Sequence, residues 1–225
     1  MGVYDFKSDL MALHDYNVNM ISREIYLHEY YVSGDESINP GIDYRMAISF
    51  IKNINFLNSL AKSDIVVHQY STGGNFTDGM AIYDALKTSL SDTVIIAYSE
   101  VSSMSSITIQ GATARLLMPN VEVLIHRGFF GTSGIPSQVY SGVEWSKRQD
   151  QKMFSIYSKR CVNSRFFKSK KMNEQDVTKY IEDKLDHCTD WFMDSQEAID
   201  FGFADKIVGT KDCRTIYEIN KKRKR

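Results

Sequence analysis

The architecture of the chain is set by residues 93–112, which read TVIIAYSEVSSMSSITIQGA. Residues 93–98 are apolar and rich in β-branched side chains, so they predict a buried strand. Small hydroxyl residues follow, and residues 103–114 predict a short buried helix. A serine at this strand-to-helix junction lies beside free N–H groups, which stabilise developing negative charge. The position suits a nucleophile, although the same serines could be simple cap and turn residues.

Strands and helices alternate on both sides of this stretch. Before it, strands are predicted over residues 24–32 and 65–70 and amphipathic helices over 43–61 and 78–87. After it, extended segments are predicted over 115–118 and 121–126. Such alternation predicts an α/β protein of repeated βαβ units with a largely parallel sheet. Functional groups then belong at the carboxyl ends of strands, where Gly73-Gly74, Ser103 and His126 all lie.

The C-terminal half combines a glycine-rich loop with several helices. Residues 127–134 form the loop, and residues 137–161 predict a long, charged helix that projects from the body of the protein. A second helix is expected over 173–185. After an extended segment at 190–194, a short helix capped by Ser195 and a last strand over 203–208 complete the chain.

The composition narrows the possible functions. With 225 residues, 43% of them hydrophobic, the chain fits one globular domain, and its net charge of −1 argues against a nucleic-acid or membrane-surface role. No apolar run is long enough to span a bilayer. The basic end, Lys221 to Arg225, is expected to be a solvated tail, with contact to an acidic partner or nucleic acid as the alternative.

Neither a metal nor a nucleotide site is predicted. Cys161, Cys188 and Cys213 lack the spacing of a zinc site or a disulfide framework, so a reducing cytoplasm is the expected location. Gly73-Gly74 lacks the spacing of the dinucleotide fingerprint and of the P-loop.

The chain does contain every group that acyl transfer requires. Ser103 could attack a carbonyl, His126 could act as general base and acid, and Asp190 could orient the imidazole. The backbone N–H groups of Gly74 and Met104 could bind the oxyanion. Asp186 and Asp194 lie near Asp190, and spacing alone does not separate the three carboxylates.

With these residues assembled, the chain resembles the proteolytic subunit of the Clp protease (ClpP), a serine peptidase of the ClpP/crotonase fold. The resemblance runs from about residue 24 to 209. Its motifs are Ser71-Thr72-Gly73-Gly74-Asn75 with Asp78-Gly79-Met80-Ala81-Ile82-Tyr83-Asp84, Ser102-Ser103-Met104-Ser105, Leu117-Met118-Pro119-Asn120 with Val123-Leu124-Ile125-His126, and Asp190-Trp191-Phe192-Met193 with Glu197-Ala198 and Phe201-Gly202.

The resemblance implies a cofactor-free serine endopeptidase of the ATP-dependent Clp type. It implies the triad Ser103, His126 and Asp190, with Gly74 and Met104 as oxyanion donors. It also implies a homo-oligomer of stacked, heptameric rings that encloses the active sites, acts on protein and peptide substrates, and works with a ring ATPase that unfolds them. The expected organisation is an N-terminal arm (1–24), a peptidase domain (25–210) with a protruding handle (about 128–163), and a basic tail (211–225).

Several positions depart from the family pattern, and they keep alternatives open. Thr72 replaces a proline, Ser99 and Glu100 replace a glycine and an apolar residue, and Ser105 replaces a glycine. One alternative is a catalytically weak structural or regulatory subunit of the same fold. Another is a phage-encoded relative that processes capsid proteins. An acyl-CoA enzyme of the crotonase relatives is the third, and the complete Ser/His/Asp set counts against it.

Overall fold

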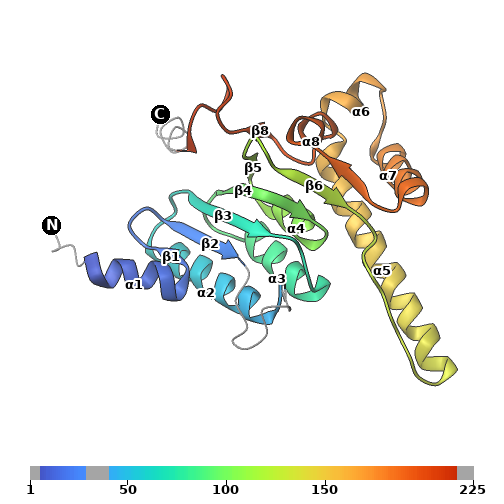
Figure 1. Ribbon diagram of the computed structural model, residues 1–225, viewed down its shortest axis with the longest axis horizontal. Helices are drawn as coiled ribbons and strands as arrows, with labels where there is room; N and C mark the ends of the chain where they lie inside the picture. The colour runs from blue at the N-terminus through green and yellow to red at the C-terminus, as the bar shows by residue number, and fades with distance from the viewer. Residues whose placement is uncertain (1–5, 29–40, 217–225) are drawn as a thin grey trace.

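The computed structural model describes residues 6–28 and 41–216 of the 225-residue chain. The predicted strand 24–32 and the turn at Pro40-Gly41 lie partly outside these residues, and the basic segment 221–225 lies wholly outside them. Figure 1 shows the elements in chain order: α1 (Phe6–Tyr16), β1 (Val18–Asn19), β2 (Glu24–His28), α2 (Tyr44–Leu60), β3 (Ile65–Ser71), α3 (Phe76–Lys87), β4 (Thr93–Ser102), α4 (Met104–Thr108), a 3₁₀ turn (Ile109–Gly111), β5 (Ala114–Leu117), β6 (Glu122–Ile125), α5 (Pro136–Cys161), α6 (Arg165–Ser169), α7 (Glu174–Cys188), β7 (Trp191–Met193), α8 (Ser195–Phe201) and β8 (Lys206–Ile207).

The sheet is built around β4. The strand order of the sheet is β1-β2-β3-β4-β5-β8. Strand β4 also pairs with β6, and β6 pairs with β7. The first half of β4 pairs with β5 and the second half with β6, both in parallel. Only the β1–β2 and β6–β7 pairs of the described strands are antiparallel. The mixed α/β fold and the largely parallel sheet expected from the alternating pattern are therefore confirmed.

Helices α2 and α3 lie side by side against one face of the sheet (Figure 1). Asp43 caps α2 by accepting hydrogen bonds from the N–H groups of Arg45 and Met46, as the polar start of the predicted helix requires. The apolar face of α2 buries Met46, Phe50, Ile54 and Leu57 in the main core. A smaller cluster includes Val66, Val94 and Ile96 of β3 and β4, together with Cys213 from the segment after β8.

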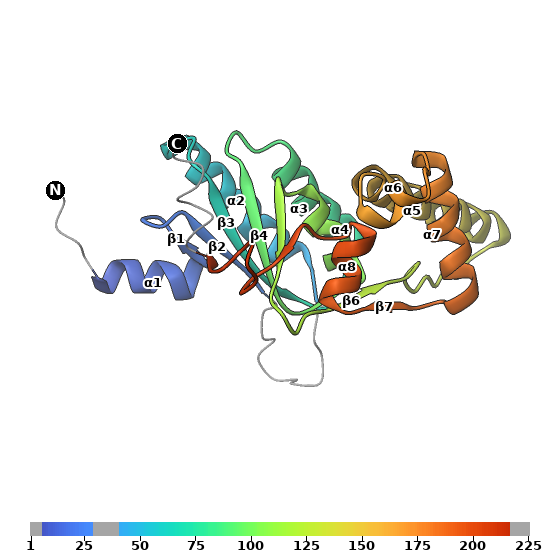
Figure 2. The same ribbon diagram turned by 90° about the horizontal axis from the view of Figure 1, so that it is seen from above.

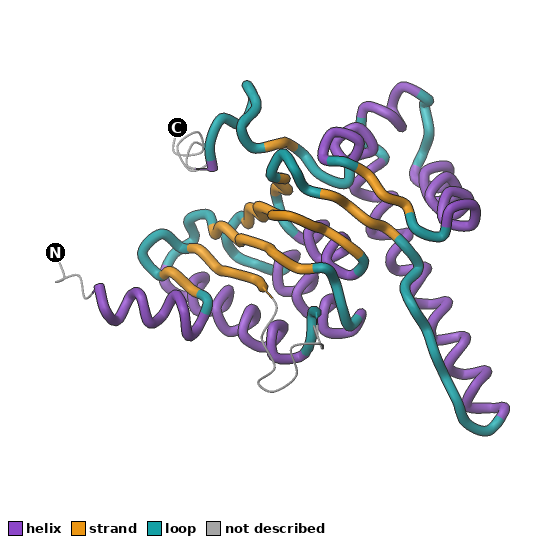
Figure 3. The backbone as a smooth tube through the Cα atoms, in the orientation of Figure 1, coloured by secondary structure: helices purple, strands orange, loops and turns teal. Residues whose placement is uncertain are grey.

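Helix α5 projects from the body of the protein beside the loop that follows β6 (Figures 1 and 3). Its first four turns are mostly exposed, and Tyr140 keeps 73% of its surface accessible. From Met153 onward the helix contributes buried side chains to the core. This is the protruding handle helix that the fold class predicts. None of the helices in the described ranges is long and apolar enough to cross a bilayer.

Two local predictions need correction. The helix predicted over 103–114 ends sooner, because pairing of Val94 with Ala114 draws the chain into β5. The N-cap of α8 is Asp194, whose carboxylate accepts a hydrogen bond from the Glu197 N–H at 2.8 Å. Ser195, the predicted cap, instead donates its hydroxyl to backbone carbonyls outside the helix.

The sequence patterns also understate the structure of two segments. Residues 6–24, expected as part of an N-terminal arm, contain α1 and β1, and β1 adds an antiparallel edge strand to β2. Helix α6, for which no pattern is evident in the sequence, comes between α5 and α7 in the chain, and Figure 2 shows these three helices grouped on one side of the sheet. The boundaries of the arm, the peptidase domain and the tail stay a prediction.

Candidate active site

Ser103 occupies the turn between β4 and α4 in a backbone conformation that favours glycine. Its φ of 54° and ψ of −127° match the first central position of a type II′ turn. The Ser103 N–H donates to the Leu124 carbonyl at 3.0 Å, which fixes the turn against β6. The turn places the partly buried Ser103 side chain at the carboxyl end of β4, where it lines a cavity.

His126 directly follows β6, the strand that runs parallel to the end of β4. Its Nε2 lies 2.7 Å from Ser103 Oγ. Its Nδ1 lies 3.3 Å from Asp190 Oδ1. A proton on Nδ1 suits both contacts, because Nε2 is then free to accept from the serine hydroxyl.

Antiparallel pairing of β6 with β7 brings Asp190 to His126. The pairs Val123–Met193 and Ile125–Trp191 fix the register, so the residue before Trp191 lies beside the residue after Ile125. Asp194 is occupied as the α8 cap, and Asp186 bonds to Arg127. The structure thus places Asp190, rather than Asp186 or Asp194, next to the imidazole.

The two glycines allow close backbone packing, Gly73 against Ser103 and Gly74 against Ile42. A Cβ added to Gly73 would lie 2.6 Å from the Ser102 carbonyl oxygen and 2.7 Å from Ser103 Cβ. Gly74, with φ of 147°, pairs with Ile42 through flanking hydrogen bonds made by Gly73 and Asn75. Since the neighbours make those bonds, the N–H of Gly74 points away from Ile42.

Gly74 and Met104 both line the same cavity as Ser103 and His126. Met104 is the first residue of α4, so its N–H has no partner inside the helix. Within the described residues, neither N–H donates a hydrogen bond. Two donors are therefore available for a negatively charged oxygen near Ser103.

The residues near Ser103 that depart from the ClpP pattern include Ser99, Glu100 and Ser105, and hydrogen bonds hold Glu100 and Ser105 in place. Ser105 lies within α4, is fully buried, and donates its hydroxyl to the Ser102 carbonyl at 2.9 Å. It does not take the positive φ for which glycine would be needed. The buried hydroxyl of Ser102 donates to the Glu100 carboxylate. Ser99 has a φ of 59° and lies where the pairing of β3 with β4 shifts register, as in a β-bulge. Beyond this bulge β4 continues to Ser102, four residues past its predicted end.

The cavity beside Ser103 has a volume of about 240 Å³. Apolar side chains from α4, α5 and the loop after β6 form much of its wall: Met104, Ile107, Phe129, Phe130, Trp145 and Met153. Gln149 and Asp150 of α5 add polar groups. Burial raises the pKa of Asp150, and the nearby Arg127 partly offsets this effect.

Sequence reasoning missed the part of the cavity that α5 supplies. The charged pattern of residues 137–161 predicted a projecting helix and gave no sign that this helix lines the cavity beside Ser103. The apolar residues Trp145 and Met153, spaced eight apart, were the available signal, since they share one face of the helix. No group of three or more His, Cys, Asp or Glu in residues 6–28 and 41–216 is arranged to hold a metal ion.

Comparisons with known proteins agree with this fold. The family model described as Clp protease matches residues 36–211, well over half of the chain. One relative is the ATP-dependent Clp protease proteolytic subunit 2 of Tropheryma whipplei (strain Twist), 28% identical over 76% of this chain and 88% of its own length. Another is the ATP-dependent Clp protease proteolytic subunit of Oltmannsiellopsis viridis, 28% identical over 74% of this chain and 80% of its own. The chain belongs to the Clp protease family.

Proposed function

We propose that the protein is a serine endopeptidase in which Ser103, His126 and Asp190 form the catalytic triad. The observation that carries the proposal is the contact between Ser103 Oγ and His126 Nε2 at 2.7 Å, with the Asp190 carboxylate on the other ring nitrogen. Membership of the Clp protease family supports peptidase chemistry.

The mechanism follows from the positions of these groups. Ser103 Oγ attacks the peptide carbonyl carbon while its proton passes to His126 Nε2. The N–H groups of Gly74 and Met104 stabilise the resulting oxyanion. When the C–N bond breaks, His126 returns the proton to the leaving amine. A water molecule, deprotonated by His126, then hydrolyses the acyl-enzyme ester and restores the Ser103 hydroxyl. Asp190 stabilises the imidazolium in both halves.

Assembly belongs to the same proposal. We expect stacked, heptameric rings that enclose the active sites, with the projecting half of α5 joining one ring to the other. Exposed aromatic side chains on this part of the chain, Phe129, Tyr140 and Trp145, support an assembled partner there. The names of both relatives, which call them ATP-dependent, support cooperation with a ring ATPase. The thiols of Cys161 and Cys188 suit the reducing cytoplasm.

The test compares the parent protein with the Ser103→Ala variant. Hydrolysis of an unstructured protein and of fluorogenic peptides should be lost, while native mass shows the same oligomer. Ser102→Ala is the matched control, because it removes an adjacent buried hydroxyl that does not reach His126. Retained hydrolysis in Ser103→Ala would refute the nucleophile. An assembled parent protein without hydrolysis would favour a structural or regulatory subunit.

A further inference from the structure

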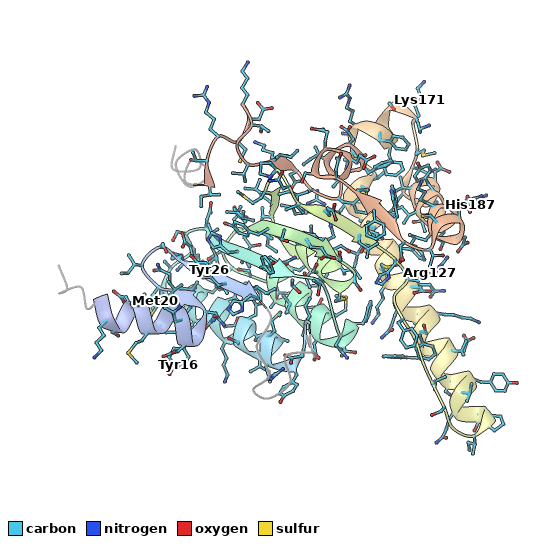
Figure 4. The ribbon with its side chains drawn as sticks, viewed as in Figure 1. Tyr16, Met20, Tyr26, Arg127, Lys171 and His187 are labelled. Atoms are coloured by element: carbon cyan, nitrogen blue, oxygen red, sulfur yellow. The ribbon has the colours of Figure 1, made fainter. Side chains whose placement is uncertain are left out.

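Arg127, the residue after His126, lies where three segments of the chain meet. Figure 4 shows it beside α5, below α7, on the chain that leaves β6. Its guanidinium donates to Asp186 Oδ1 of α7 at 2.6 Å and to Asp150 Oδ2 of α5 at 3.3 Å. It also stacks over the ring of Phe154, with 4.9 Å from Cζ to the ring centroid. One side chain therefore joins the His126 segment to both helices.

Asp190 depends on this connection because little else holds its carboxylate. The side chain is 48% exposed, and among the described residues its carboxylate contacts only the ring of His126. Its position is set by the backbone between α7 and β7, where Thr189 has φ of 61°. Asp186 lies in the last turn of α7, four residues before Asp190. Anchoring Asp186 to the residue after His126 therefore fixes the distance between the imidazole and the end of α7.

The charges around Arg127 hold its guanidinium between α5 and α7, with Asp186 62% exposed and Asp150 23% exposed. Two carboxylates, Asp150 and Asp186, share one guanidinium. Burial lowers the pKa of Arg127, but the hydrogen bonds and charges of Asp186 and Asp150 outweigh it and raise the pKa overall. The side chain is 37% exposed. A planar guanidinium presents five N–H donors in fixed directions, which suits two carboxylates on different helices better than the compact ammonium of a lysine.

We propose that Arg127 is a positioning residue, which holds α7 against the segment after β6 so that Asp190 stays aligned with His126. The inference rests on the proposed serine peptidase mechanism. A displacement of about 1 Å in a catalytic group can lower a rate by about a hundredfold. Loss of Arg127 should therefore lower kcat and leave substrate binding largely intact.

The test measures kcat and KM for a fluorogenic peptide with Arg127→Gln, Asp186→Asn and the double variant. Arg127→Gln should lower kcat by about tenfold to a hundredfold, with KM within about twofold of the parent value. The double variant should fall no further than Arg127→Gln alone, because Asp186→Asn removes a contact that Arg127→Gln has already broken. Arg127→Lys should give an intermediate kcat. Lys147→Gln, which breaks the exposed pair with Glu144 on the same helix, is the control and should match the parent protein.

Three results would overturn the inference. The first is an unchanged kcat in Arg127→Gln. The second is a loss confined to KM, which would make Arg127 a substrate contact in the cavity wall. The third is a double variant whose losses add. If Arg127→Gln fails to assemble by native mass, Arg127→Lys takes its place, and a parental kcat there refutes the role. Failure of the proposed function itself is distinct, because the parent protein would then hydrolyse nothing.

Discussion

Replacing Ser103 with glycine should stabilise the protein relative to replacing it with alanine, although neither variant should hydrolyse peptides. A non-glycine residue held at φ 54° and ψ −127° bears a strain of about 1–3 kcal/mol. Glycine removes that strain but gains about 0.5–1 kcal/mol of extra chain entropy in the unfolded state. The balance favours Ser103→Gly over Ser103→Ala by roughly 0.5–2 kcal/mol.

Both variants lose the hydroxyl that contacts His126, so this contact cancels from the comparison. For a chain of this size, about 1 kcal/mol corresponds to roughly 2–4 °C in Tm. Urea denaturation and thermal scans at equal subunit concentration measure the difference, and native mass confirms equal assembly. Equal stability, or a more stable alanine variant, would refute the idea that the turn at Ser103 stores backbone strain.

Three further predictions concern other groups. Asp190→Asn should lower kcat by about 10⁴-fold while leaving the oligomer intact, because the imidazole then loses the carboxylate that orients it; near-normal turnover would exclude Asp190 from the triad. Iodoacetamide should modify the exposed Cys188 of the folded protein and spare Cys161, since burial raises the pKa of the Cys161 thiol to about 12; equal modification by mass spectrometry would contradict the packing. Asp205 is paired with the buried Arg115: burial raises the pKa of the Asp205 carboxyl group, but the hydrogen bonds and charge of Arg115 outweigh burial and lower this pKa overall. The loss of stability in Asp205→Asn should therefore be full near pH 7 and should shrink as the pH falls below about 4. A loss of stability that does not depend on pH would count against the ion pair.

Elements with a local pattern were predictable from the sequence. The spacing of Met46, Ile54 and Leu57 predicts α2, and the structure buries all three in the core. The position of Ser103 between a buried strand and a helix was equally visible. These features depend on neighbouring residues, whose hydrophobic period the sequence displays directly.

Features that depend on long-range pairing were not predictable in the same way. Choosing Asp190 over Asp186 and Asp194 requires the register of β6 against β7, which joins residues far apart in the sequence. The cavity wall supplied by Trp145 and Met153 requires the return of α5 to the body of the protein. Asp194 and not Ser195 caps α8, because the Ser195 hydroxyl donates to the Val121 carbonyl, a contact that the local sequence does not reveal.

The most direct test of the central claim is fluorophosphonate labelling of the assembled protein, followed by peptide mapping. The reagent reacts with a serine only when a neighbouring base activates it and N–H donors stabilise the adduct. We expect one adduct per subunit on Ser103, absent from Ser103→Ala and strongly slowed in His126→Ala. No adduct in the assembled parent protein, or an adduct on another serine, would contradict the proposed active site.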